Sequence, residues 1–186
     1  MTLESIVIRR FDGPGAAAQL DALLPAYEEV YAAPPYEEGP RDVAEFVELR
    51  PPDQHPPRVP PRTGDARRAG RRLCVRLLPA AATSWWQGSS SRARPTFVRE
   101  DGRRTFAVIE LAVRGPIRRR GIARQLHDEL LAGLAAERVV LTVRPEPAAA
   151  PARCAYESWG YEFVGETRPQ QDGPLYRSMM LSITPN

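Results

Sequence analysis

A basic turn between a predicted strand and a predicted helix has the residue types best suited to binding a ligand. Three arginines at 118–120 precede Gly121, and the chain is expected to enter a helix at Gly121, Ile122 and Ala123, so that Gly121 lies in the first helical turn. The free N–H groups of a first helical turn and the helix dipole attract anions. Gly121 lets a ligand approach the backbone, and Ala123 keeps that approach open. The residues alone leave two interpretations open, a phosphate-binding turn and a solvated charge cluster.

The turn resembles a motif of the GNAT-type N-acetyltransferases. Residues 118–123 match the pattern R/Q-x-x-G-x-G/A, the family's loop for the pyrophosphate of acyl-CoA. Residues 151–161 are similar to a second family pattern, A-x-x-x-Y-x-x-x-G-F/Y. The resemblance implies an acyltransferase that moves an acetyl group from acetyl-CoA to a primary amine. The amine would belong to a small molecule or a peptide N-terminus.

The same resemblance implies a fold and a cofactor site. The expected architecture is one α/β domain over residues 1–186, with its best-matching core at 106–183. A GNAT-like mixed central sheet would be flanked by helices, and its fourth and fifth strands would splay to admit the pantetheine arm. The cofactor-binding residues expected from the resemblance are Leu111, Ala112, Val113, Arg118, Arg119, Arg120, Gly121, Ile122, Ala123 and Arg124.

A tyrosine is the expected general acid. Acetyl transfer requires a neutral amine, a stabilised oxyanion and a proton for the departing thiolate. A tyrosine hydroxyl, with a pKa of about 10, donates a proton while staying uncharged near neutral pH. Tyr156 occupies the position of the family's proposed general acid. The alternative is an aromatic residue that only packs its helix onto the sheet.

Glu110 is the candidate general base because it is the only carboxylate in the predicted fourth strand. The resemblance places Ala107 and Ile109 on the cleft-facing side of that strand. Alternation would then turn Glu110 to the opposite face unless a bulge re-aims it. A water chain or Glu37 is the alternative base. His127, on the helix after the turn, is expected to be exposed rather than to act as a base.

Acceptor contacts are expected from two regions. Tyr36 and Glu37, followed by Glu38, lie between two predicted helices that in GNAT folds form one wall of the acceptor cleft. Trp85 and Trp86 precede the fourth strand. These acidic and aromatic residues suggest a cationic, partly apolar amine. The alternatives are a merely polar loop and, for the tryptophans, one ring that packs on the core.

Hydrophobic periodicity predicts the remaining elements. A helix from Ala16 contains Pro25, which should kink or split it. A second helix is expected at 41–49, and a further one begins at Pro151 and ends near Trp159. The predicted strands lie at 5–9, 73–78, 106–113, 139–143 and 175–183, and a further strand begins with residues 161–164.

The segment 51–72 does not fit this scheme. It holds six prolines and six arginines, and Val59 is its only branched aliphatic residue. Because proline removes ladder donors, the segment is expected to be irregular or disordered and unable to form a central strand. Two explanations stay open: a genuine basic insertion, and a stretch translated in a shifted reading frame that would impair activity.

The composition of the chain narrows the classes of function that it can have. The apolar content of 42% is ordinary for a globular protein, and the net charge is only +3. Basic residues concentrate between Arg58 and Arg124, which favours a local anionic ligand over general nucleic-acid or membrane affinity. The two cysteines have no metal-ligand spacing, and neither a signal core nor a membrane-spanning run is evident. The expectation is a cytoplasmic enzyme without a metal, with a homodimer left open.

Two other functions remain as alternatives. The first is a catalytically inactive relative that binds CoA without turning it over. The second is a nucleic-acid-binding protein that uses its arginine clusters.

Overall fold

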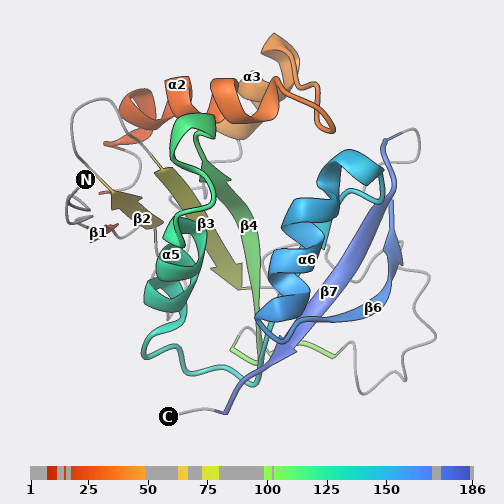
Figure 1. The fold of residues 1–186 in the computed structure, drawn as a ribbon. Coiled ribbons are helices and arrows are strands. Elements are labelled where there is room, and N and C mark those ends of the chain that lie inside the picture. Colours follow the sequence, from red (N-terminus) through yellow and green to blue (C-terminus); the bar gives the residue numbers. More distant parts are fainter. Residues whose placement is uncertain are drawn as a thin grey trace. The chain divides into compact units, whose positions relative to one another are not determined.

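The structure is a computed structural model that describes residues 8–11, 15, 18–48, 63–66, 73–79, 99–101, 103–168 and 173–184. The chain divides into two compact units, one of residues 1–77 and 110–132 and the other of residues 78–109 and 133–186. Strand β4 (Thr105–Val113) contributes to both, because the division falls after Ile109. Figure 1 shows the ribbon.

The first unit contains the predicted anion turn and two helices that precede it. Its elements are β1 (Ile8–Phe11), α2 (Leu20–Tyr31), α3 (Pro40–Glu48), β2 (Thr63–Ala66), most of β3 (Leu73–Pro79), the end of β4, η2 (Gly115–Ile117) and α5 (Ile122–Leu131). Strand β2 pairs antiparallel with β1 and with β3. Helix α5 contacts β2, and α2 and α3 lie near the end of β4 (Figure 1).

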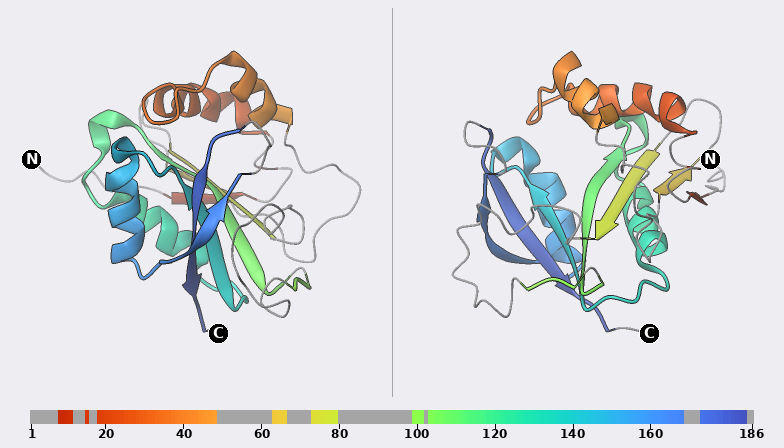
Figure 2. Two further views of the ribbon diagram at one scale, coloured as in Figure 1. Left: turned by 90° about the vertical axis from the view of Figure 1, so that its right-hand side faces the viewer. Right: turned by 180° about the vertical axis from the view of Figure 1, so that it is seen from behind.

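The second unit contains the start of β4 and the C-terminal part of the chain. Its other elements are β5 (Arg138–Val143), η3 (Pro147–Ala149), α6 (Ala150–Ser158), β6 (Glu162–Thr167) and β7 (Tyr176–Ser182). The strand order is β4-β5-β7-β6, with β4 and β5 parallel and the other pairs antiparallel. Helix α6 lies beside this sheet in each view of Figures 1 and 2.

The fold class expected from the sequence is confirmed. The sheet is mixed, because β4 and β5 are parallel whereas β1–β2 and β5–β7 are antiparallel, and helices accompany it in both units. The parallel ladder joins Thr105–Val108 to Arg138–Leu141, whereas β4 itself continues to Val113. Strand β5 is buried except at Thr142, which explains its run of β-branched residues.

The expectation for segment 51–72 was wrong in one place. Strand β2, at Thr63–Ala66, lies inside that segment and has a partner on each side. Its residues are free to donate ladder hydrogen bonds because all six prolines of the segment lie at 51–61. Apart from β2, the segment lies outside the described residues.

Helix α2 also differs from one of its predicted forms. It continues through Pro25 as one helix rather than two. Pro25 is exposed, whereas Leu23, Ala26 and Tyr27 are buried beside it. Proline has no backbone N–H, so the helix loses one hydrogen bond at this position. Burial of the apolar face offsets that loss.

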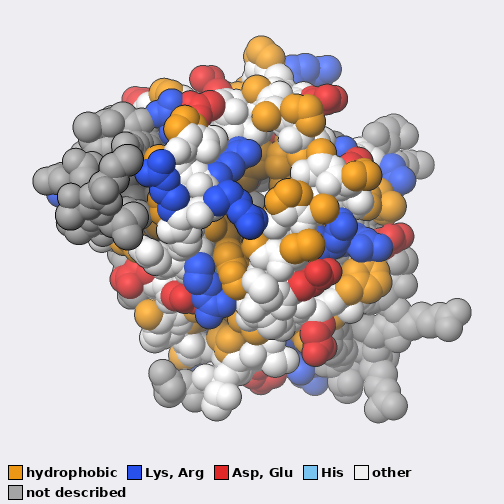
Figure 3. Space-filling model, in the orientation of Figure 1, with side chains coloured by type: hydrophobic (Ala, Val, Ile, Leu, Met, Phe, Trp, Pro, Cys, Tyr) orange, Lys and Arg blue, Asp and Glu red, His pale blue; other side chains and the backbone are white. Residues whose placement is uncertain are grey.

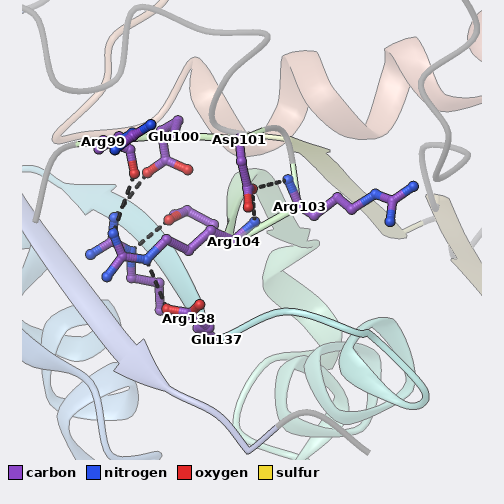
Figure 4. Close-up of polar contacts among 8 residues, drawn as sticks. Arg99, Glu100, Asp101, Arg103, Arg104, Glu137 and Arg138 are labelled. Atoms are coloured by element: carbon purple, nitrogen blue, oxygen red, sulfur yellow. Dashed lines mark hydrogen bonds and ion pairs between the residues drawn. The ribbon is translucent and has the colours of Figure 1, made fainter. Parts of the chain in front are cut away.

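A buried ion-pair network fixes the start of the β4–β5 ladder (Figure 4). The side chain of Arg138, 5% exposed, donates from Nε to the hydroxyl of Thr105 at 2.5 Å and from a terminal nitrogen to Glu100 at 2.9 Å. Beside it, Arg104 donates to Glu137 at 2.7 Å. Thr105 and Arg138 are also register partners, so side chains and backbone hold the same alignment.

The helices of the described part of the chain are all too short or too polar to cross a lipid bilayer.

Candidate functional site

The predicted anion turn has a conformation that its glycine makes accessible. After β4 the chain passes through η2 and then places Arg119 at φ 62° and Gly121 at φ 74°. Helix α5 starts at the next residue, one residue later than the sequence predicts, and Gly121 is its N-cap. Left-handed backbone is costly for residues with a side chain, and Gly121 adopts it without that cost. Arg118, Arg119, Arg120 and Gly121 are all exposed.

Gly121 leaves the N-terminal end of α5 open. It is the N-cap residue and makes no side-chain capping bond to the first helical turn. A Cβ atom at this position would meet nothing within 4 Å. The hydrogen bond from Gln125 N to Gly121 O, 3.1 Å long, begins the helical pattern. The residues therefore fit an anionic group, because the N–H groups of a first helical turn lack intrahelical partners and the space beside Gly121 is open.

The arginines around the turn divide into two kinds. Arg118 donates from Nε to the carbonyl oxygen of Val113 at 2.8 Å, which ties the turn to the end of β4. Arg124 donates to Asp128 one helical turn later, also at 2.8 Å. Arg119 and Arg120, which lie between these two residues in the chain, are exposed. Figure 3 shows basic side chains gathered on this face of the molecule.

A carboxylate of α2 holds the start of the turn. Glu29 accepts a hydrogen bond from Nε of Arg114 at 2.6 Å and forms a second contact to a terminal nitrogen of the same guanidinium. Arg114 is the residue between β4 and η2. The hydrogen bond from Arg114, the charges of Arg114 and Arg118 and the backbone N–H of Gly115 lower the pKa of Glu29. Sequence reasoning missed this contact.

The predicted acceptor loop contains an aromatic cluster with a tightly held carboxylate. Tyr27 donates its hydroxyl to Glu38 at 2.5 Å, and the backbone N–H of Glu38 donates to the carbonyl of Tyr31 at 2.9 Å. The ring of Tyr31 lies 4.5 Å from that of Tyr27 and 4.9 Å from that of Tyr36, centroid to centroid. Glu37 is exposed at φ 52°. Trp85 and Trp86 lie outside the described residues.

Glu110 lies on the side of β4 that faces this cluster. Ala112, two residues further along the strand, packs with Tyr27 and Tyr31, and alternate residues of a strand share a face. Burial and the negative charge of Glu110, with the hydrogen bond to Glu38, raise the pKa of Tyr27. The structure thus brings Glu110 close to the loop of Tyr36 and Glu38. Tyr27 is the residue that sequence reasoning overlooked, since it lies in the helix expected from Ala16 and no site role was predicted for it.

Tyr156, the predicted general acid, belongs to the second unit and is half-buried on α6. Its ring meets Trp159 and Tyr161 edge-on, with centroids 5.4 Å and 5.8 Å away. The helix ends before Gly160, whose φ of 93° lets the chain turn into β6. These contacts fix the ring while part of it stays accessible. They are compatible with both the acid and the packing role.

The expectation for His127 was wrong. This side chain is 2% exposed, and it lies on α5 with Leu126 and Leu130 in the core. Burial lowers its pKa, although neighbouring Asp128 opposes the shift in part. The buried face of α5 therefore includes His127 together with Ile122, Leu126 and Leu130.

This burial predicts a pH-dependent stability. The pKa of His127 is lower in the folded than in the unfolded chain, so the unfolded chain binds more protons below about pH 6.5. The free energy of unfolding should therefore fall as the pH drops from about 7.5 to about 5, by at most about 1.4 kcal/mol per pH unit. Urea unfolding across this range measures it. In a folded His127→Gln variant the slope should flatten, and an unchanged slope contradicts the prediction.

Comparison with known proteins adds the fold family. No family model and no curated protein matches the chain. An aminoglycoside 6′-acetyltransferase type Ii is 18% identical, with 97% of this chain and 99% of that chain covered and a TM-score of 0.61. NAA60 from Arabidopsis thaliana, solved with acetyl-CoA, is 15% identical (96% and 100% covered, TM-score 0.57). The ribosomal-protein-S18-alanine N-acetyltransferase from Escherichia coli is 18% identical (98% and 96%, TM-score 0.56). The chain therefore has the GNAT fold.

Proposed function

We propose that this GNAT-fold protein is an N-acetyltransferase that moves the acetyl group of acetyl-CoA to a primary amine. The observation that carries the proposal is the turn at 118–123, where a left-handed glycine opens a helix N-terminus beside exposed arginines. Acetyl-CoA is named with NAA60, an aminoglycoside is named in a second structural relative, and the alanine of ribosomal protein S18 is named in a third. An amine of a small molecule or of a peptide N-terminus is thus the proposed acceptor.

In the proposed reaction the amine nitrogen attacks the thioester carbonyl, a tetrahedral intermediate forms, and the carbon–sulfur bond breaks. The hydroxyl of Tyr156 gives its proton to the departing thiolate. Glu110, or a water chain beside it, takes the proton that the amine loses. The backbone of Leu111, Ala112 and Val113 pairs with the pantetheine arm. Ile122, Ala123 and the exposed arginines hold the pyrophosphate.

Two measurements test the proposal together. Calorimetry should show binding of acetyl-CoA, and a thiol-release assay should show turnover with at least one class of amine. The screen covers aminoglycosides, polyamines, amino acids and peptide N-termini, and mass spectrometry should find the acetylated product. Binding without turnover of any amine would instead identify an inactive CoA-binding relative. Absence of binding would reject the proposal.

The exposed arginines also make nucleic-acid binding a competing function, which salt distinguishes. Phosphate contacts give an affinity that falls steeply as salt rises. Filter binding of DNA and RNA at two salt concentrations should show little salt-dependent binding. The single-domain organisation, the cytoplasmic location and the open question of a homodimer stay predictions.

A further inference from the structure

Glu29 contacts Arg114, which lies just before the turn at 118–123, the proposed cofactor turn. This contact has no role in the reaction as proposed above. Glu29 lies on α2, 85 residues before Arg114 in the chain, and its carboxylate meets both Nε and a terminal nitrogen of that guanidinium. The pKa of Arg114 is raised, chiefly by this hydrogen bond. Both side chains are about one-third exposed, at 33% and 36%. An ion pair at the surface adds little to the free energy of unfolding. Stability therefore does not account for an ion pair at the start of the turn.

We propose that Glu29 is a positioning residue for the cofactor turn, an inference that rests on the proposed binding of acetyl-CoA there. Arg114 is the last residue before η2, and the turn at 118–123 follows η2 directly. Glu29 fixes Arg114 from one side, and Arg118 fixes the far end of η2 through its bond to Val113 O. With both ends of η2 held, the left-handed residues Arg119 and Gly121 start from a defined position.

Helix α2 thereby links the cofactor turn to the predicted acceptor loop. Glu29 and Tyr27 are two residues apart, which places them on different faces of the helix. Glu29 holds Arg114, while buried Tyr27 holds Glu38 in the loop. A ligand that restricts the motion of the turn should therefore also restrict the motion of α2.

A positioning role and a purely electrostatic role of Glu29 predict opposite changes in acetyl-CoA affinity when its charge is removed. Glu29 is an acidic group close to a site proposed for phosphate. If it acted only through its charge, removing that charge would strengthen acetyl-CoA binding. If it positions the turn, removing the charge weakens binding although the surroundings become more positive.

Calorimetry with acetyl-CoA on the full chain decides between them. Glu29→Gln should weaken binding by about twofold to fivefold, the range of exposed ion pairs. Glu28→Gln is the matched control, because Glu28 is the exposed neighbour on α2 and its removal changes the net charge equally. The control should bind as the parent does, or slightly better. Unchanged or stronger binding by Glu29→Gln would overturn the inference.

Hydrogen exchange supplies a readout that a purely structural role would not change. Acetyl-CoA should slow amide exchange in α2 as well as in α5 of the parent protein. In Glu29→Gln the slowing should stay in α5 and be lost from α2, with an unchanged unfolding temperature. Equal slowing of α2 in both proteins overturns the inference while leaving acetyl-CoA binding intact. If the parent protein does not bind acetyl-CoA, the proposed function and the inference fall together.

Discussion

The Gly121→Asp variant should lose more acetyl-CoA affinity than any single arginine-to-alanine variant of the turn. Three effects act together in it. Gly121 has φ 74°, a conformation that costs other residues about 1–3 kcal/mol. Among the residues that the structure describes, none has an atom within 4 Å of a Cβ at this position, and this is the space proposed for the pyrophosphate. The new carboxylate also repels that anion. Together we expect a loss of about 100-fold or more in affinity, measured by calorimetry.

Two controls separate these effects. Gly133, just beyond the other end of α5, has φ 69° and equally open space around a Cβ. Gly133→Asp therefore adds the same charge and a similar backbone strain away from the turn, and it should keep its acetyl-CoA affinity. Gly121→Ala keeps the strain without the charge and should fall between the parent and Gly121→Asp. Normal affinity in folded Gly121→Asp would place the cofactor elsewhere.

For Tyr156→Phe we expect kcat to fall by about 10²–10⁴-fold, the usual contribution of general acid catalysis. The phenyl ring keeps the edge-on contacts to Trp159 and Tyr161, so folding should be retained. Only the proton for the leaving thiolate is lost. Acetyl-CoA affinity should barely change, because the substitution does not touch the turn. Steady-state kinetics with an acceptor from the amine screen measure kcat, and calorimetry measures affinity.

Tyr161→Phe is the matched control for this experiment. Tyr161 belongs to the same aromatic group and is 3% exposed, so the variant removes a hydroxyl from the same surroundings. Its kcat should stay close to that of the parent. If Tyr156→Phe also has nearly normal kcat, Tyr156 packs the helix and the proton comes from another group.

Local patterns in the sequence were sufficient to predict the positions of the turn and of most strands. The predicted strands at 106–113 and 139–143 each differ from β4 and β5 by one residue at one end. Buried strands are runs of apolar and β-branched residues, and such runs are visible without knowledge of their partners. The start of the helix was predicted to within one residue, but the left-handed backbone that makes Gly121 the N-cap of α5 was not predicted.

Contacts between distant residues could not be predicted in this way. Nothing in the sequence distinguishes Glu29, which binds Arg114, from Glu28 beside it. Strand β2 was not predicted, because the composition of 51–72 as a whole is rich in proline although β2 itself contains none. The strand forms because β1 and β3 pair with it. His127 is buried by tertiary packing beside Leu126 and Leu130, and its identity as a polar residue gave no sign of this.

The network at the start of the β4–β5 ladder sets an order of events during synthesis. Arg138 follows its partner Thr105 by 33 residues and Glu100 by 38. At a translation rate of about 5–20 residues per second, Thr105 is made about two to seven seconds before the guanidinium that it will contact. Until then the hydroxyl of Thr105 and the carboxylate of Glu100 have no Arg138 to bind. A nascent chain that stalls before Arg138 therefore cannot close this ladder, however long it waits on the ribosome.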